Sequence, residues 1–252
     1  MKLINWECLE EMDKLIAEWV KVDAIITDPP YWTTACKWDS IIPFDAMWER
    51  LNKLIKPNGA IVLFGSEPFS SALRMSNIKN YKYDWVWEKT MSWWFVHAKN
   101  KPLKKHENLL VFSNWTTVHK SQSKRRMPYF PQMSEWKPFK RIMKSWTWWT
   151  ILHSNSKVNE DYIWKELINT WTRYPTSVIK FSNWNNKNVH PTQKPVALME
   201  YLIKTYTHEW ETVLDFTMWS GSTGVWAKNT NRKFIGIEKE LNIFNWAKER
   251  LT

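Results

Sequence analysis

An acid and an aromatic residue flank two prolines at Asp28-Pro29-Pro30-Tyr31, directly after a mainly apolar run from Val22 to Ile26. Such a run ending in a Pro-Pro turn predicts a buried strand whose carboxyl end carries Asp28 and Tyr31 into a crevice. Asp28 can accept a hydrogen bond from an exocyclic amino group, and the Tyr31 ring offers a face for stacking. These residues suit chemistry on a flat heterocyclic amine, although an ordinary Asp-Pro turn is about equally expected when the motif is taken alone.

A second pattern lies between residues 212 and 238. The expected strand from Val213 to Phe216 precedes a turn of small residues around Gly221 that opens a helix, which lets backbone approach a nucleotide-like ligand closely. A further strand, Phe234 to Ile237, ends at Glu238, about twenty residues past the turn, where nucleotide-binding sheets place an acid that accepts from ribose hydroxyls. Turn, strand and acid together indicate a nucleotide-like cofactor.

Length and charge narrow the class of protein. The chain of 252 residues is long enough for one α/β domain with an insertion. Its net charge of +11 indicates a polyanionic partner. The two cysteines, Cys8 and Cys36, form no disulfide framework, so we expect the protein in a reducing cytoplasm. Neither they nor the six histidines have the spacing of metal ligands, so we expect no metal. No apolar run approaches the length of a membrane span, so we expect no membrane association.

A third motif, HPTQKP, occupies residues 190–195. Together with the two motifs above, it gives a resemblance, over most of the chain, to the β group of amino-methylating DNA methyltransferases, which use S-adenosylmethionine. In that circularly permuted order, the catalytic motif precedes the target-recognition region and the cofactor motif comes last. Here DPPY at 28–31, YDWVWEK at 83–89, a basic middle, HPTQKP and the cofactor turn follow in that order. DPPY, in contrast to the SPPY typical of cytosine-N4 enzymes, points by resemblance to adenine in duplex DNA.

The resemblance implies roles for individual residues. The catalytic residues would be Asp28, Pro29, Pro30 and Tyr31. The target base would swing out of the duplex and stack on Tyr31. Its amino group would donate hydrogen bonds to the Asp28 carboxylate and the Pro29 carbonyl and attack the sulfonium methyl group of the cofactor. No metal is needed for this reaction, because the methyl donor is already activated. The expected cofactor-binding positions are Asp215, Phe216, Thr217, Trp219, Gly221, Glu238, His190, Thr192 and Lys194. A loop that caps the helix beginning near Pro195 is the less favoured alternative for the last three.

The alternation of strand and helix patterns predicts a Rossmann-like α/β fold, with a mainly parallel sheet and helices on both faces. Expected strands are 24–27, 60–64, 84–87, 109–112, 213–216 and 234–237, and expected helices are 44–54, 195–206, 223–229 and 240–251. We expect residues 1–114 to form the catalytic part of the core, 115–185 a target-recognition insertion, and 186–252 the cofactor-binding part.

The middle of the chain is strongly basic. Between His97 and Lys144 there are twelve Lys and Arg against two Glu, with aromatic residues interleaved. A charge run is usually a solvated face. Beside a methyltransferase core it instead suggests a surface that grips duplex DNA, and we expect Lys124, Arg125 and Arg126 to take part.

The glycine content is far below expectation. At a usual share of about 7% the chain would hold roughly 18 glycines, yet it has 5, alongside 21 Trp. Several Trp stand where turns favour Gly, namely at 6, 32, 115, 210 and 219, whereas Trp38, Trp48, Trp85 and Trp87 have ordinary aromatic contexts. We hypothesise that many of these Trp are in fact glycines. The organism would read the codon UGA as Gly, whereas the sequence was translated with a genetic code that reads UGA as Trp. A UGG codon at 219 would end the idea.

Several alternatives stay open. Relatives carry roughly F-x-G-x-G where this chain has Thr217, Trp219 and Gly221, so a genuine Trp219 would block the cofactor and leave a DNA-binding relative of impaired activity. The amino methylation of cytosine, RNA or protein would use the same core. Phe64-Gly65-Ser66, Trp87 and Lys89 fit either the target pocket or plain strand packing. A homodimer and a cognate restriction endonuclease are further expectations from the resemblance.

Overall fold

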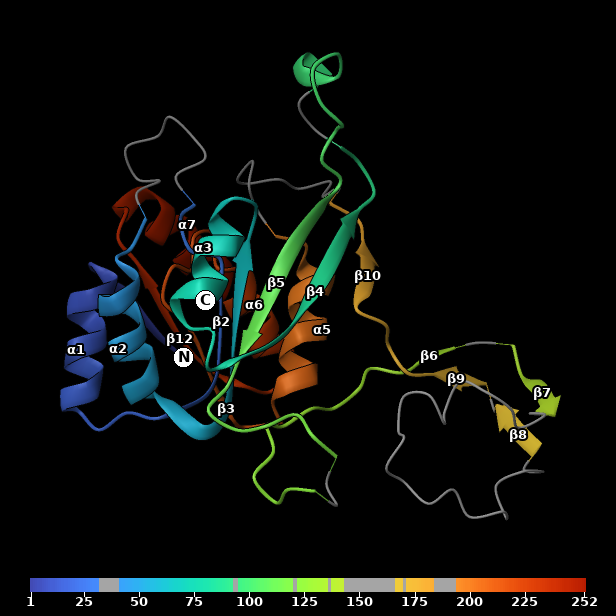
Figure 1. Ribbon diagram of the computed structural model, residues 1–252. Coiled ribbons are helices and arrows are strands. Elements are labelled where there is room, and N and C mark those ends of the chain that lie inside the picture. The colour runs from blue at the N-terminus through green and yellow to red at the C-terminus, as the bar shows by residue number, and fades with distance from the viewer. Residues whose placement is uncertain are drawn as a thin grey trace. The chain divides into compact units, whose positions relative to one another are not determined.

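The computed structural model describes residues 1–31, 41–92, 95–119, 122–135, 137–142, 166–169, 171–183 and 194–252. Its central feature is an eight-stranded sheet in the order β1-β12-β11-β2-β3-β5-β4-β10 (Figure 1). In that order the strands are Lys2–Asn5, Lys233–Glu238, Thr212–Asp215, Val22–Thr27, Ile55–Gly65, His106–Phe112, Tyr81–Lys89 and Val178–Phe181.

One strand runs against the others. β5 pairs antiparallel with both β3 and β4, while every other neighbouring pair in this sheet is parallel. β4 and β5 therefore form a hairpin, and its connection, residues 90–105, leaves the sheet at the edge where the parallel strands have their carboxyl ends. That connection includes a short 3₁₀ helix, η1, at Phe95–His97.

Helices cover both faces of the sheet (Figure 1). One face carries α1 (Cys8–Ala17), α2 (Phe44–Leu54) and α3 (Phe69–Ser76), and the other carries α5 (Val196–Tyr206), α6 (Ser222–Asn229) and α7 (Leu241–Leu251). Successive strand residues serve opposite cores: Ala24 packs with α5, whereas Ile25 packs with α1 and α2. Burial on both faces explains why β2 is an almost continuous apolar run.

Residues 131–175 form a separate compact unit. Its described part contains two antiparallel pairs: β6 (Ser134–Glu135) with β9 (Thr172–Arg173), and β7 (Phe139–Ile142) with β8 (Glu166–Asn169). The unit lies within the expected insertion of residues 115–185. Residues 115–130 instead belong to the larger unit, where Met127 is buried in the core and the Phe130 amide donates to the Thr205 carbonyl.

The predicted fold class is confirmed, and each predicted strand and helix has a counterpart in the sheet or its covering layers. The prediction omitted the helices α1 and α3, the sheet-edge strands β1 and β10, and the four short strands β6 to β9. Among the described helices, none combines the length and apolar character needed to cross a membrane. No group of three or more metal-ligating side chains occurs within the described part of the chain.

Left-handed backbone falls repeatedly on tryptophan. Of the four described non-glycine residues with positive φ, three are Trp19 (58°), Trp210 (67°) and Trp219 (49°). Bulky residues rarely adopt this conformation. Trp210 and Trp219 are among the positions suspected from the sequence, Trp6 and Trp115 do not have positive φ, and Trp32 lies outside the described residues.

Trp19, which the sequence did not single out, has the geometry of a helix-terminating glycine. After α1, its amide donates to the Ile16 carbonyl at 3.0 Å and the Val20 amide donates to the Leu15 carbonyl at 3.0 Å, which is the Schellman motif. Its side chain is 88% exposed, whereas Trp48 and Trp85 are buried in the cores. This contrast supports the interpretation that some of the Trp positions suit Gly and others suit Trp.

Replacing Trp19 with Gly should therefore stabilise the protein by about 1 kcal/mol, because Gly removes the steric cost of left-handed backbone and no packed side chain is lost. The matched control, Trp48→Gly, should destabilise it by at least about 3 kcal/mol through a core cavity. Chemical unfolding of the three proteins measures both changes. A loss of stability in Trp19→Gly would show that the indole is needed at this turn.

Candidate active site

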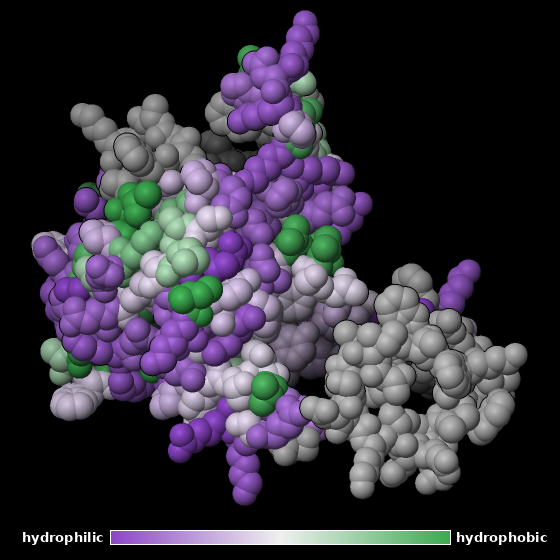
Figure 2. Space-filling view, in the orientation of Figure 1, coloured by the Kyte–Doolittle hydropathy of each residue, from purple (hydrophilic) through white to green (hydrophobic). Residues whose placement is uncertain are grey.

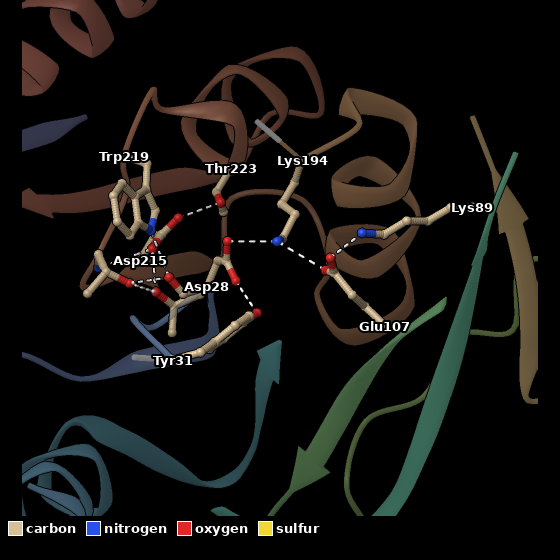
Figure 3. A network of polar contacts seen from close by, with 10 residues as sticks. Asp28, Tyr31, Lys89, Glu107, Lys194, Asp215, Trp219 and Thr223 are labelled. Atoms are coloured by element: carbon tan, nitrogen blue, oxygen red, sulfur yellow. Dashed lines mark hydrogen bonds and ion pairs between the residues drawn. The ribbon is translucent and has the colours of Figure 1, made fainter. Parts of the chain in front are cut away.

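Three acidic residues meet at the carboxyl edge of the sheet. Asp28 directly follows β2, Asp215 ends β11 and Glu238 ends β12, and these three strands are parallel neighbours. Adjacent parallel strands end at the same edge, where open α/β sheets bind their ligands. The structure thus brings the two motifs, nearly 190 residues apart for Asp28 and Asp215, into one site (Figure 3).

Asp28 is engaged through both carboxylate oxygens. Oδ2 lies 2.8 Å from the Lys194 ammonium, and Oδ1 accepts a hydrogen bond from the Tyr31 hydroxyl (Figure 3). The Tyr31 ring packs against Phe69 with centroids 5.0 Å apart. Burial raises the pKa of Asp28 above its usual value and the nearby Glu107 adds to this, while Lys194 acts in the opposite direction. Lys194 is therefore the group that most favours the ionised form of this carboxylate.

Lys194 belongs to a short chain of alternating charges. Its ammonium lies 3.1 Å from Glu107 Oε2, and the other Glu107 oxygen accepts from the Lys89 ammonium (Figure 3). Burial alone would raise the pKa of Glu107, but the two ammonium groups outweigh it and lower the pKa to about 2. Burial opposes the charge on Lys194, yet the two carboxylates raise its pKa. The pKa shifts of Glu107 and Lys194 thus both favour the charged forms of this buried pair.

Asp215 has hydroxyl and amide partners in place of a cation. It accepts from Thr27 Oγ1 at 2.6 Å, from Thr223 Oγ1 at 2.5 Å and from the Thr217 amide at 3.2 Å. Burial raises its pKa to about 7 in spite of these donors. Asp215 therefore ties β2 to the start of α6 and fixes the turn between β11 and that helix.

Glu238 and Gly221 shape the same turn. The Glu238 carboxylate accepts from the Trp219 amide at 3.0 Å and from the Glu240 amide at 2.9 Å, which leaves acceptor positions for further donors such as ribose hydroxyls. Gly221 caps α6 with φ of 74°, a conformation that Gly adopts freely. The backbone and acids fit a nucleoside-bearing cofactor.

The Trp219 side chain does not fit such a cofactor. Its indole Nε1 donates to the Asp28 carbonyl at 2.8 Å, so the ring lies between the turn and the catalytic motif (Figure 3). A methyl donor whose ribose bound Glu238 would have to extend toward Asp28 through the space that the indole fills. With Gly at 219 the space is open, and the positive φ at this position is one that Gly tolerates.

The structure separates some of the other predicted site residues from this edge. Phe216 is buried in the core beneath α1, α2 and α3. Thr217 is in the site, where its hydroxyl donates to the Asp28 carbonyl at 3.0 Å. Pro29 and Pro30 are buried in the turn after β2. His190 and Thr192 lie outside the described residues.

The basic triplet Lys124, Arg125 and Arg126 lies at the opposite end of the sheet. β5 runs away from the catalytic edge, and Ser113, which follows it, donates to the Gly59 carbonyl at the foot of β3. The triplet is tied to this region because the Thr116 amide donates to the Arg125 carbonyl at 3.3 Å. The loop that carries it is seen below the sheet in Figure 1.

Sequence reasoning missed Glu107, Thr27 and Thr223. Glu107 lies in the polar first half of a strand whose second half is apolar, and this acid beside a buried run was the available signal. Thr27 and Thr223 flank the two motifs, and buried carboxylates need such donors.

Comparison with known proteins agrees with this geometry. A family model described as DNA methylase, of the N6/N4 class, matches residues 22–249. The Type II methyltransferase M2.LlaDCHI of Lactococcus lactis subsp. cremoris is 28% identical over 99% of this chain and 88% of its own length. The Type II methyltransferase M2.DpnII of Streptococcus pneumoniae is 27% identical over 100% and 89%. The crystal structure of the M1.HpyAVI–SAM complex covers 100% of this chain and 98% of its own, with a TM-score of 0.65 and 26% identity.

A parallel sheet with a nucleoside-binding turn beside a DPPY motif, matched by the family model over most of its length, defines the class of protein. The chain belongs to the N6/N4 family of DNA methylases. It is a DNA methyltransferase that depends on S-adenosylmethionine.

Position 219 provides a direct test of the cofactor site. The Trp219→Gly variant should bind S-adenosylmethionine at least about tenfold more tightly than the Trp219 form, because the indole no longer fills the space beside Asp28. Calorimetric titration measures both affinities. Whichever of these two proteins, Trp219 or Trp219→Gly, binds S-adenosylmethionine more tightly is used in the experiments below and is called the cofactor-binding form.

Trp210→Gly is the matched control, since it also relieves positive φ but precedes β11 at the far end of the sheet. It should leave cofactor affinity unchanged. Equal binding by the Trp219 and Trp219→Gly proteins would mean that the indole does not obstruct the cofactor.

Proposed function

We propose that this protein transfers a methyl group from S-adenosylmethionine to the exocyclic amino group of adenine in duplex DNA. The observation that carries the proposal is the Asp28 carboxylate, which lies 2.8 Å from the Lys194 ammonium at the edge where the cofactor turn also ends. A carboxylate there can accept a hydrogen bond from an amino group, and the DPPY motif that contains it resembles the adenine enzymes.

The chemistry follows from the weakness of the nucleophile. The amino lone pair is delocalised into the adenine ring, so hydrogen bonds from the amine to Asp28 and to the Pro29 carbonyl would draw the nitrogen toward a tetrahedral shape. When bound, S-adenosylmethionine supplies an activated methyl group. The protein's own task is to hold the amine in line and to exclude water.

Tyr31 must change partners for this to occur. Its hydroxyl now donates to Asp28 Oδ1, the oxygen that a target amino group would need. Swinging the base out of the duplex would bring its ring onto the Tyr31 face and its amine onto Oδ1, replacing the hydroxyl. The contact between Tyr31 and Asp28 thus satisfies the carboxylate until the base arrives.

Asp28→Ala in the cofactor-binding form should lower the rate of methyl transfer roughly a hundredfold or more, because a preorganised acceptor is lost. DNA affinity should stay nearly unchanged, since Asp28 does not contact phosphates in this scheme. Transfer of labelled methyl groups to duplex DNA measures the rate. Asp13→Ala, which removes an exposed carboxylate of α1 paired with Arg50, is the matched control. Near-normal turnover of Asp28→Ala would dismiss the assigned role.

Two basic surfaces are candidates for the DNA contact. The triplet at 124–126 is the one expected from the sequence. The connection between β4 and β5 is the other: residues 90–105 hold four lysines and no acid, and leave the sheet at the catalytic edge. Lys99, Lys101 and Lys105 are exposed there, and Figure 2 shows this projection largely hydrophilic.

Replacing Lys124, Arg125 and Arg126 together by Ala should weaken DNA binding and reduce its salt dependence, by a slope of about 0.9 for each phosphate that the protein no longer neutralises. The matched variant replaces Lys99, Lys101 and Lys105. Binding to a duplex at several salt concentrations measures both slopes. An unaltered slope for the triplet, with a reduced slope for the hairpin lysines, would assign the DNA-binding surface to the hairpin.

Cytosine-N4 methylation is the second candidate, because the same amine-accepting edge serves either base. Chromatography of nucleosides from methylated DNA distinguishes N6-methyladenine from N4-methylcytosine. We also propose that the protein works beside a restriction endonuclease of the same specificity, since its relatives are named Type II methyltransferases. By the same resemblance, we propose a homodimer, which light scattering tests.

A further inference from the structure

Lys194 lies in the HPTQKP segment, which the family resemblance places along the cofactor. In the structure, the described contacts of this side chain are with residues of the catalytic motif and of neighbouring strands. Its ammonium is 2.8 Å from Asp28 and 3.1 Å from Glu107, and the side chain is only 11% exposed. The ammonium also lies over the rings of Phe64, at 5.2 Å from the centroid, and Tyr31, at 5.8 Å. Of these neighbours, Phe64 belongs to β3 and Glu107 to β5, while Asp28 and Tyr31 lie in the turn that carries the DPPY motif after β2.

We propose that Lys194 is a positioning residue for the catalytic carboxylate, held in place by Glu107 and Lys89, and that it acts on Asp28 and not on the cofactor. This inference rests on the proposed function of Asp28. It deepens that function by naming the group that keeps the acceptor ionised and aimed.

The charges of the cluster explain why all four residues are needed. A buried Asp28 alone would take up a proton, and a protonated carboxyl is a poorer acceptor for an amine. Lys194 supplies the compensating charge. Glu107 lies on the far side of Lys194 and holds the ammonium from a second direction, and Lys89 neutralises the remaining oxygen of Glu107. The cluster is neutral as a whole.

Glu107 and Lys194 have opposite effects on Asp28. The ammonium of Lys194 favours the ionised carboxylate, whereas the negative charge of Glu107 disfavours it. Removing Lys194 therefore moves the protonation of Asp28 to higher pH, and removing the charge of Glu107 moves it to lower pH. A purely structural role for the two residues would not produce shifts of opposite sign.

The experiment measures kcat/KM for methyl transfer to duplex DNA between about pH 5.5 and 9, in the cofactor-binding form and its variants, because this quantity reports ionisations of the free enzyme. Lys194→Met should lose activity more at low pH than at high pH, by at least about tenfold between pH 6 and pH 8. Lys194→Arg keeps the cation and should keep the acid limb of the parent. Glu107→Gln should move that limb toward lower pH.

Calorimetry supplies the second readout. Lys194→Met should bind S-adenosylmethionine within about twofold of the parent, because the proposal places Lys194 away from the cofactor. A large loss of cofactor affinity would overturn the proposal, and so would a loss of activity that is uniform across pH. If Lys194→Met does not fold by circular dichroism, Glu107→Gln decides: an acid limb that stays or moves to higher pH contradicts the proposal. A parent protein that methylates no DNA would instead refute the proposed function.

Discussion

The burial of carboxylates at one sheet edge is the constraint on which the rest of the site depends. Each acid needs compensation, because an isolated buried charge is costly. The protein meets this need in different ways: a lysine for Asp28, hydroxyls and an amide for Asp215, backbone amides for Glu238 and two lysines for Glu107. Asp28 and Glu107 share one cation, Lys194, so each of these two acids influences the other through it.

The parts of the site that could be predicted were those governed by strand direction. Asp28, Asp215 and Glu238 follow apolar runs, and parallel strands gather their final residues at one edge, so the motifs alone brought these acids together. Glu107 could not be placed in this way. Its strand looks like its neighbours in sequence, and only the pairing shows that β5 is reversed and that its first residues reach the catalytic edge.

The sequence also predicted only in part which Trp positions have left-handed backbone. Sequence contrast with ordinary turns pointed to Trp210 and Trp219, whose backbone is left-handed, but it also pointed to Trp6 and Trp115, where it is not, and it overlooked Trp19 at the end of α1. Turn preference is a local tendency, whereas φ is set by the hydrogen bonds that end a helix or precede a strand. Trp48, Trp85 and Trp87, which were expected to be ordinary from their aromatic contexts, are buried in the cores, and Trp38 lies outside the described residues.

The reversal of β5 has an evolutionary consequence. In a sheet of parallel strands, each connection must cross from one end of the layer to the other, so its length is limited by the packing beneath it. The hairpin between β4 and β5 begins and ends at the same edge, beside Glu107 and Lys89, and crosses nothing. Insertions and deletions in residues 90–105 can therefore accumulate without rethreading the core. Such changes would alter the surface next to the reaction centre and leave the charged cluster, which is set by the strands, in place.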